Sequence, residues 1–282
     1  MKRVRVLAAG LLQLLVGGLA QVGGLYAWRF LAHPAIVAAL SLDEPVVTIT
    51  RRLGVLVAGV LSYWAFVRLY ERRPVTELRL RLGWTLVAGV AGALSIAVTI
   101  GFLFATRHAV ALSWRGFATT GDVLAQIGVA AMLEELMFRA LLFRILEERA
   151  GTKWALVASA LFFGVAHAAN GGFSAISLVS VPLCGLMWAG VYVLSRNVWV
   201  AAAHHACWNG AIFLSGLPLS GQEGWRAQAP LVSRYQGAEL WSGGAFGPED
   251  SLINVVVCAL ICVWLWRLAA RTDPTFPRNG AA

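Results

Sequence analysis

The sequence predicts an all-α polytopic membrane protein with about eight transmembrane helices. Of its 282 residues, 59% are hydrophobic and only 13% are charged, and the mean hydropathy is +0.72. A soluble protein could not bury that much apolar surface. Several apolar stretches reach the length of about 20 residues with which a helix crosses the hydrocarbon core. The eight stretches cover residues 6–27, 53–70, 84–105, 122–144, 153–169, 174–195, 198–216 and 251–267.

Basic residues gather in alternate loops between these stretches. Fourteen of them flank the termini or lie in the second, fourth and sixth loops: Lys2, Arg3, Arg5, Arg72, Arg73, Arg79, Arg81, Arg144, Arg149, Lys153, Arg196, Arg267, Arg271 and Arg278. The remaining loops carry seven: Arg29, Arg51, Arg52, Arg107, Arg115, Arg226 and Arg234. The positive-inside rule therefore predicts an inner (cytoplasmic) membrane protein with both termini in the cytoplasm. The net charge of +9 is then a topology signal, and no nucleic-acid partner is expected.

The N-terminal segment allows a second interpretation. Its basic start and the small residues near Ala20 are also typical of a signal peptide. The apolar run continues to Ala27, however, and removal of this span would place the arginine-rich C-terminus outside. We therefore expect the first span to be retained.

We expect three parts along the chain. Residues 1–121 hold spans one to three, residues 122–216 hold a core of spans four to seven, and residues 217–282 hold the longest loop and the last span. The linker at 72–82 has an amphipathic pattern and is expected to lie in the membrane interface. Polar residues inside spans concentrate between Gln126 and Asn209, so a buried site is expected in the core.

Two adjacent glutamates and an arginine lie inside the fourth span. A charge near the bilayer centre costs roughly 2.5–3.5 kcal/mol on insertion scales, so Glu134, Glu135 and Arg139 need a reason to be there. Residues four apart share a helix face, whereas adjacent residues point about 100° apart. Glu135 is therefore expected to form an ion pair with Arg139. Glu134 has no cation at helical spacing, which indicates a chemical role.

Spans five and seven place histidines and an asparagine at the same depth in the membrane as Glu134. His167 lies in span five, and His204, His205 and Asn209 lie in span seven. At a rise of 1.5 Å per residue, Glu134, His167, His205 and Asn209 lie about 12–21 Å from the cytoplasmic ends of their helices. All four thus fall near the midplane of a core of roughly 30 Å. His204 points away from His205 and is expected to pack, although an exchange of their roles stays open.

Other chemistries have weaker support in the sequence. All four cysteines fall inside predicted spans, which favours packing roles, and Cys207 has no evident activating arrangement. Ser159 and Ser180 lack a GxSxG setting. Zinc stays open, because Glu134, His167 and His205 are possible ligands, but the chain has no HExxH motif. We favour a site without a cofactor.

Three motifs in this order resemble the signature of a known family. Glu134-Glu135-Leu-Met-Phe-Arg139 is similar to EExxxR, Phe163-Gly-Val-Ala-His167 to FxxxH, and His205-Ala-Cys-Trp-Asn209 to HxxxN. Together they resemble the CPBP family of intramembrane endopeptidases, which includes the type II CAAX prenyl proteases and bacterial relatives linked to bacteriocin immunity. The resemblance covers residues 122–216, less than half of the chain.

The resemblance implies membrane helices around an intramembrane catalytic cavity and a glutamate-activated water as nucleophile. Glu134 would be the general base, aided by His167. His205 and Asn209 would polarise the scissile carbonyl and hold the oxyanion, while Glu135 and Arg139 would shape the site. The expected partners are a peptide or protein substrate in the membrane and the lipid bilayer itself.

Two other functions stay open at this stage. The same buried Glu and His side chains would suit a proton-coupled transporter, although the sequence shows no inverted repeat. A non-catalytic relative that binds a membrane partner, in immunity or secretion, would also keep the motifs.

Overall fold

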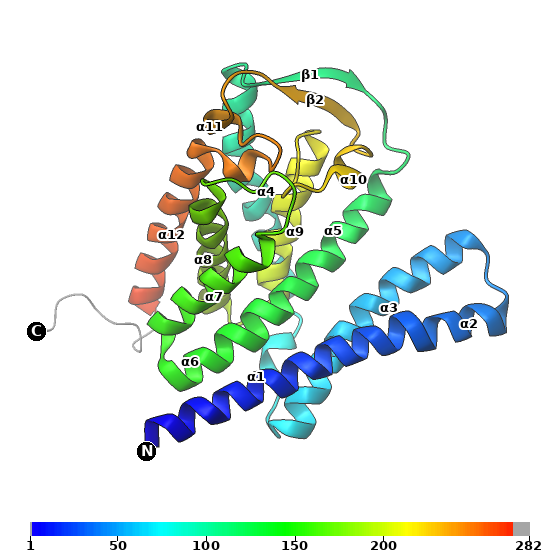
Figure 1. Ribbon diagram of the computed structural model, residues 1–282, viewed down its shortest axis with the longest axis vertical. Coiled ribbons are helices and arrows are strands. Elements are labelled where there is room, and N and C mark those ends of the chain that lie inside the picture. Colours follow the sequence, from blue (N-terminus) through cyan, green and yellow to red (C-terminus); the bar gives the residue numbers. More distant parts are fainter. Residues whose placement is uncertain (1, 273–282) are drawn as a thin grey trace, which may run out of the picture.

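A computed structural model describes residues 2–272 of the chain, and almost all of its regular structure is helical. The long helices from residue 82 onward form one bundle, and the N-terminal helices extend from it to one side (Figure 1). The first turn of α1 (Lys2–Tyr26) and the last turn of α12 (Leu252–Thr272) point to the same end. Arg278, counted above among the basic residues, lies outside the described residues. The prediction of an all-α polytopic membrane protein is confirmed.

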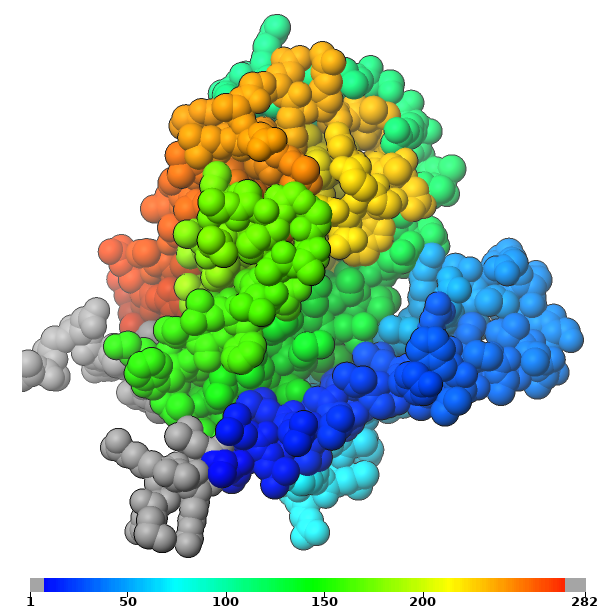
Figure 2. All heavy atoms as spheres, viewed as in Figure 1, coloured from blue at the N-terminus to red at the C-terminus, as the bar shows by residue number. Residues whose placement is uncertain are grey.

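The first two spans form a hairpin that is longer than the sequence predicted. Helix α1 continues through the π-helical turn η1 (Ala27–Ala32) into α2 (His33–Leu40). After a reversal, α3 (Glu44–Ala65) and the π-helical η2 (Phe66–Tyr70) return. The tip of the hairpin stands away from the rest of the molecule (Figure 2). The apolar periodicity predicted that the first span ends near residue 27 and that the second begins near residue 53, whereas helix continues to Leu40 and begins again at Glu44.

Close helix approach holds this hairpin together. A Cβ at Gly24 of α1 would overlap Ser62 Oγ of α3, and one at Gly54 of α3 would overlap the ring of Trp28. Glycine at both positions therefore lets the two backbones approach.

The linker after η2 is a polar network with only a short 3-10 turn, η3 (Thr76–Leu78). Glu77 is buried and accepts hydrogen bonds from Tyr63 and from Arg73 (Nη2 to Oε1, 2.6 Å). Glu71 accepts from Arg144 Nη2 at 2.7 Å. The expected amphipathic linker is thus fixed by buried ion pairs that tie it to α3 and to the region around Arg144.

Helix α4 (Leu82–Ala105) packs along α9 (Val198–Leu214). A Cβ at Gly92 would overlap the backbone of His204, so this glycine sets the contact. At the end opposite the termini, β1 (Ala109–Trp114) pairs antiparallel with β2 (Leu231–Tyr235) and, together with the short α10 (Glu223–Arg226) and α11 (Glu239–Ser242), covers the bundle (Figure 1).

The core of the bundle comes from the middle of the chain. Helix α5 (Thr120–Glu135) continues through the π-helical η4 (Leu136–Phe143) into α6 (Arg144–Ala150), and α7 (Thr152–His167) returns. Helix α8 (Ser177–Ser195) and α9 follow. The chain then passes through the covering loops and the turn η5 (Pro248–Asp250) into α12.

Five helices of the described part of the chain are long and apolar enough to cross a membrane: Ala8–Leu40, Glu44–Tyr70, Leu82–Ala105, Ser177–Ser195 and Leu252–Arg271. The other three expected spans are present as α5 with η4, α7 and α9. Helices α7 and α9 have only 16 and 17 residues, and the α5–η4 segment carries four charged residues. These three contribute the polar residues of the core.

Candidate active site

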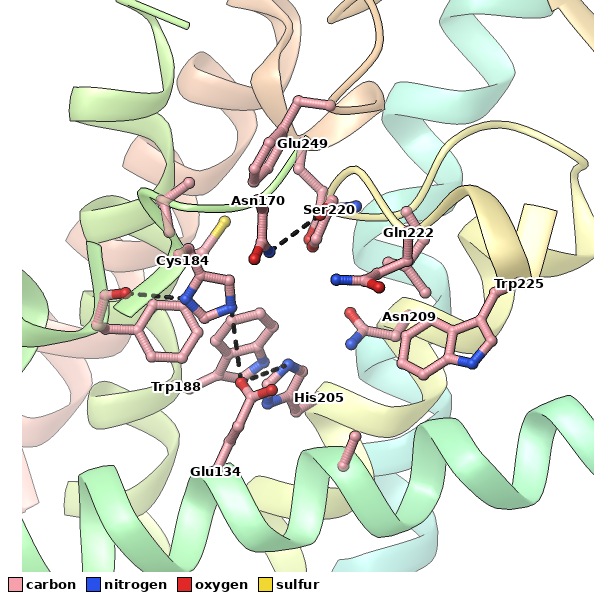
Figure 3. Close-up of a pocket in the computed structure, with 16 residues that line it drawn as sticks. Glu134, Asn170, Cys184, Trp188, His205, Asn209, Ser220, Gln222, Trp225 and Glu249 are labelled. Carbon is pink, nitrogen blue, oxygen red and sulfur yellow. Dashed lines mark hydrogen bonds and ion pairs between the residues drawn. The ribbon is translucent and has the colours of Figure 1, made fainter. Parts of the chain in front are cut away.

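The residues predicted from three separate spans line one pocket. Glu134 comes from α5, Phe163 and His167 from α7, and His205 and Asn209 from α9 (Figure 3). The cavity has a volume of about 70 Å³, which is room for several water molecules. The arrangement brings a carboxylate, two imidazoles and an amide within reach of one small molecule.

Glu134 faces both imidazoles across a gap. Its Oε2 lies 3.8 Å from His167 Nε2 and 3.9 Å from His205 Nε2, too far for direct hydrogen bonds. Within the described part of the chain, Glu134 Oε2 is buried and has no hydrogen-bond partner, although the side chain as a whole is 30% exposed. Gaps of this size suit a bridging water or substrate oxygen.

The tautomer of His167 is set by its own helix. His167 Nδ1 lies 2.9 Å from the carbonyl oxygen of Phe163. A carbonyl only accepts, so Nδ1 carries the hydrogen and Nε2 is directed to Glu134. The two rings also lie 4.4 Å apart between centroids. The spacing of four in Phe163–His167 thus has a physical role, because it orients the imidazole.

Glu135 and Arg139 form a buried ion pair beneath the pocket. Glu135 Oε2 lies 3.1 Å from Arg139 Nε, and both side chains are fully buried. Arg139 Nη2 donates to the carbonyl of Gly185 at 2.9 Å, and its guanidinium lies 4.9 Å from the centre of the Phe163 ring. The charged pair is therefore held by α5, η4, α7 and α8 together.

The second oxygen of Glu135 reaches His205. Glu135 Oε1 lies 2.9 Å from His205 Nδ1. Because an ionised carboxylate only accepts, His205 Nδ1 donates and Nε2 faces the pocket. Trp188 stacks on the His205 ring with 3.7 Å between centroids. Sequence spacing indicated the Glu135–Arg139 pair, but it contained no signal for this contact between α5 and α9.

His204 lies outside the pocket. Its Nδ1 accepts a hydrogen bond from Trp188 Nε1 at 3.2 Å, and the side chain is buried. Trp188 thus contacts both histidines, with its ring against His205 and its N–H toward His204. Of these two neighbouring histidines, His205 is the one that faces Glu134.

Asn209 lies one helical turn beyond His205 and lines the same pocket. Its side-chain oxygen is buried and, within residues 2–272, has no hydrogen-bond partner. Cys207, between these two residues, does not line the pocket and lies near Gly89 of α4. The geometry therefore offers Cys207 no contact with the histidines of the site.

The covering loops contribute residues that the sequence did not indicate. Asn170 Nδ2 donates to the carbonyl of Ser220 at 3.0 Å, and both residues line the pocket (Figure 3). Gln222 and Trp225 lie at the same rim. The expectation that polar site residues concentrate inside spans left these loop residues out. The available signal was the cluster of polar and aromatic residues in the long 217–250 segment.

Glu249 is a second carboxylate in the pocket wall. It accepts hydrogen bonds from Ser220 N at 3.1 Å, from Ser220 Oγ at 2.6 Å and from Trp208 Nε1 at 3.3 Å. Burial raises the pKa of Glu249, although the hydrogen bond from Ser220 opposes the shift. Its contacts tie the Ser220 loop, α9 and the start of α12 together.

A metal ion has limited support in this geometry. Among the described residues, no group of three His, Cys, Asp or Glu side chains is arranged to hold one. The two imidazole nitrogens that face Glu134 are the nearest approach to such a set.

Comparison with known protein families gives one match. Residues 114–211 match the family described as type II CAAX prenyl endopeptidase Rce1-like, and this segment contains all three motifs. Comparisons with curated proteins and with solved structures gave no match.

Proposed function

We propose that this chain hydrolyses a peptide bond of a membrane-associated or membrane-embedded substrate with a glutamate-activated water. Its residues 114–211 match the Rce1-like family of type II CAAX prenyl endopeptidases. The family supports a CAAX-type intramembrane endopeptidase, and the apolar helices support an integral membrane protein. The observation that carries the mechanism is the buried, unpartnered Oε2 of Glu134, facing two imidazoles at 3.8 and 3.9 Å.

Glu134 and His167 activate the water. A water between Glu134 Oε2 and His167 Nε2 donates one hydrogen to each, because the Nε2 of neutral His167 has a free lone pair. As the water oxygen attacks the scissile carbonyl carbon, its proton passes to Glu134. Glu134 then gives that proton to the leaving amine as the C–N bond breaks. The carboxylate is regenerated, so protons and bonds balance over the cycle.

His205 and Asn209 hold the oxyanion. Asn209 donates through its amide nitrogen. His205 Nδ1 is committed to Glu135, so Nε2 donates only when the imidazole is protonated. The Glu135 carboxylate stabilises that cation, and Arg139 balances the charge of Glu135. Each donor to a developing oxyanion contributes on the order of 3 kcal/mol.

The proposed setting is the inner membrane with both termini in the cytoplasm, supported by the 14-to-7 division of basic residues. The partners are a peptide or protein substrate and the bilayer.

The test compares cells that carry the intact protein with cells that carry Glu134→Gln at matched abundance. Glu44→Gln, an exposed glutamate at the start of α3, is the matched control. Quantitative mass spectrometry of membrane and secreted peptides should show fragments with the intact protein and with Glu44→Gln that are missing with Glu134→Gln. Identical fragments in all three strains would contradict the peptidase function.

A further inference from the structure

The pocket is closed toward the end of the bundle that holds the termini. Ser159 Oγ of α7 donates to the carbonyl of Phe138 in η4 at 3.3 Å, and the Phe138 and Phe163 rings meet edge to face at 5.1 Å. The fully buried Glu135 and Arg139 fill the space between these helices. A substrate therefore has no path to Glu134 from the end of the bundle that holds the termini.

The opposite side of the pocket is formed by loops and is partly open. Asn170, Ser220, Gln222 and Glu249 all lie in the segments that cover the bundle at the end away from the termini (Figures 1 and 3). Glu134 is 30% exposed and His167 is 15% exposed. The alanines on either side of His167 are exposed as well. The route to the reacting groups thus runs between α5 and α7 and under these loops.

Basic residues of the described chain lie at both ends of the bundle. Arg73 and Arg196 lie in connections between helices at the end that holds the termini, whereas Arg107 and Arg226 lie in or next to the covering segments. Arg29, Arg51 and Arg52, which the sequence placed in a loop on the opposite side, lie within η1 and α3. Among the basic residues of the predicted loops and termini, the division is 14 against 7. The end with fewer Lys and Arg faces away from the cytoplasm, and that is the end at which the pocket opens.

We propose that the substrate reaches Glu134 from the extracytoplasmic side, so that the enzyme cleaves exported or membrane-anchored polypeptides within a segment in the outer half of the bilayer or just outside it. This rests on the proposed peptidase function. It narrows the substrate class, because a lipid-modified C-terminus held at the cytoplasmic surface would have no route to the pocket. The step that supplies the substrate is then translocation of a polypeptide across the membrane.

Cysteine labelling tests the side on which the pocket opens. The parent is Cys207→Ala, because Cys207 is exposed and Cys184, Cys258 and Cys262 are buried. Single cysteines are placed at the rim, as Ala168→Cys and Gln222→Cys, and at the other end of the bundle, as the matched control Lys153→Cys. All three positions are exposed. A membrane-impermeant sulfonated maleimide is added to intact spheroplasts and, separately, to permeabilised ones.

In intact spheroplasts, we expect at least tenfold more label at residues 168 and 222 than at residue 153, and similar labelling of all three after permeabilisation. Label at residue 153 alone in intact spheroplasts would overturn the proposal. Two independent rim positions are used, so that if one variant misfolds the other still tests the proposal. Any label on the Cys207→Ala parent measures the background from the three buried cysteines.

The positions of the cleavage sites give the second readout. Fragments that depend on Glu134 should map to exported proteins or to the outer ends of membrane spans. Glu134-dependent sites confined to cytoplasmic segments would overturn the substrate class while leaving the peptidase function intact. Absence of any Glu134-dependent fragment would instead overturn the peptidase function and the substrate class with it, whereas the labelling would still identify the open side.

Discussion

Glu135 of α5 and His205 of α9 are joined by a hydrogen bond of 2.9 Å between Oε1 and Nδ1. This contact gives the two adjacent glutamates different surroundings. Glu134 faces the open pocket with a free oxygen, whereas Glu135 is fully buried between Arg139 and His205. In the proposed mechanism, the 100° between consecutive helix positions separates Glu134, which activates the water, from Glu135, which supports His205.

Glu135→Gln should damage both folding and catalysis. The substitution leaves the buried Arg139 without its counter-ion, and breaking a buried pair from one side costs about 3–5 kcal/mol. It also removes the anion that stabilises protonated His205. We expect a lower melting temperature in detergent and, in the folded fraction, a kcat at least tenfold lower with KM nearly unchanged. A variant that loses stability but keeps full kcat would show that Glu135 has only a structural role.

His204→Gln and His205→Gln form a matched pair of neighbouring substitutions. Because His205 faces Glu134 and His204 accepts from Trp188, His205→Gln should lower kcat about 100-fold or more. His204→Gln should lower it less than about tenfold, with the loss traced to packing. Turnover of a fragment-releasing substrate, normalised to folded protein, measures both. Equal losses would contradict the assignment.

Chelation should leave the activity unchanged. In the proposed mechanism Glu134 acts on water directly, so EDTA or 1,10-phenanthroline should change the turnover of the purified protein less than about twofold. Loss of activity that added Zn²⁺ restores would favour the alternative in which Glu134, His167 and His205 are zinc ligands.

The folded protein should lose stability at acid pH because of Glu77 in the linker. Burial by itself raises the pKa of Glu77, but hydrogen bonds from Arg73 and Tyr63 outweigh burial, so the pKa lies below its ordinary value of 4.5. A carboxyl group with a lowered pKa in the folded state stabilises the protein above its unfolded pKa, and this stabilisation is lost as the pH falls through the folded pKa. The melting temperature should therefore drop below about pH 4.5.

The matched variant for this effect is Glu77→Gln. It should be less stable near neutral pH by about 1–3 kcal/mol, because the charged partners Arg73 and Arg144 lose their anion. Its melting temperature should also change less between pH 6 and pH 4 than that of the intact protein. If the melting temperature of both proteins falls equally between pH 6 and pH 4, the effect comes from other carboxyl groups.

Much of the fold follows from local patterns along the chain. Apolar runs of spanning length and alternate basic loops do not depend on which helices touch, so the all-α membrane architecture is predictable. The ends of helices are less predictable. The α1–α2 segment continues to Leu40 through the π-helical turn η1, and Pro34 directly follows that turn, where the regular α-helical hydrogen-bond pattern is already interrupted.

The loop residues of the pocket show the other limit of sequence reasoning. Ser220 and Glu249 are 29 positions apart and meet through a hydrogen bond of 2.6 Å. No helical period connects them, since the intervening chain passes through β2 and α11. Their meeting depends on how the loops fold over α9.

The sequence by itself determined the membrane class, the uneven distribution of basic residues among the loops and the residues that we propose for the chemistry, because hydropathy, charge and helical spacing are local properties. Tertiary structure decided which partners those residues have. It brought Glu134, His167, His205 and Asn209 to one pocket, joined Glu135 to His205, turned His204 away and closed one end of the cavity. These outcomes depend on helix rotation and packing, which bring together residues far apart in the chain.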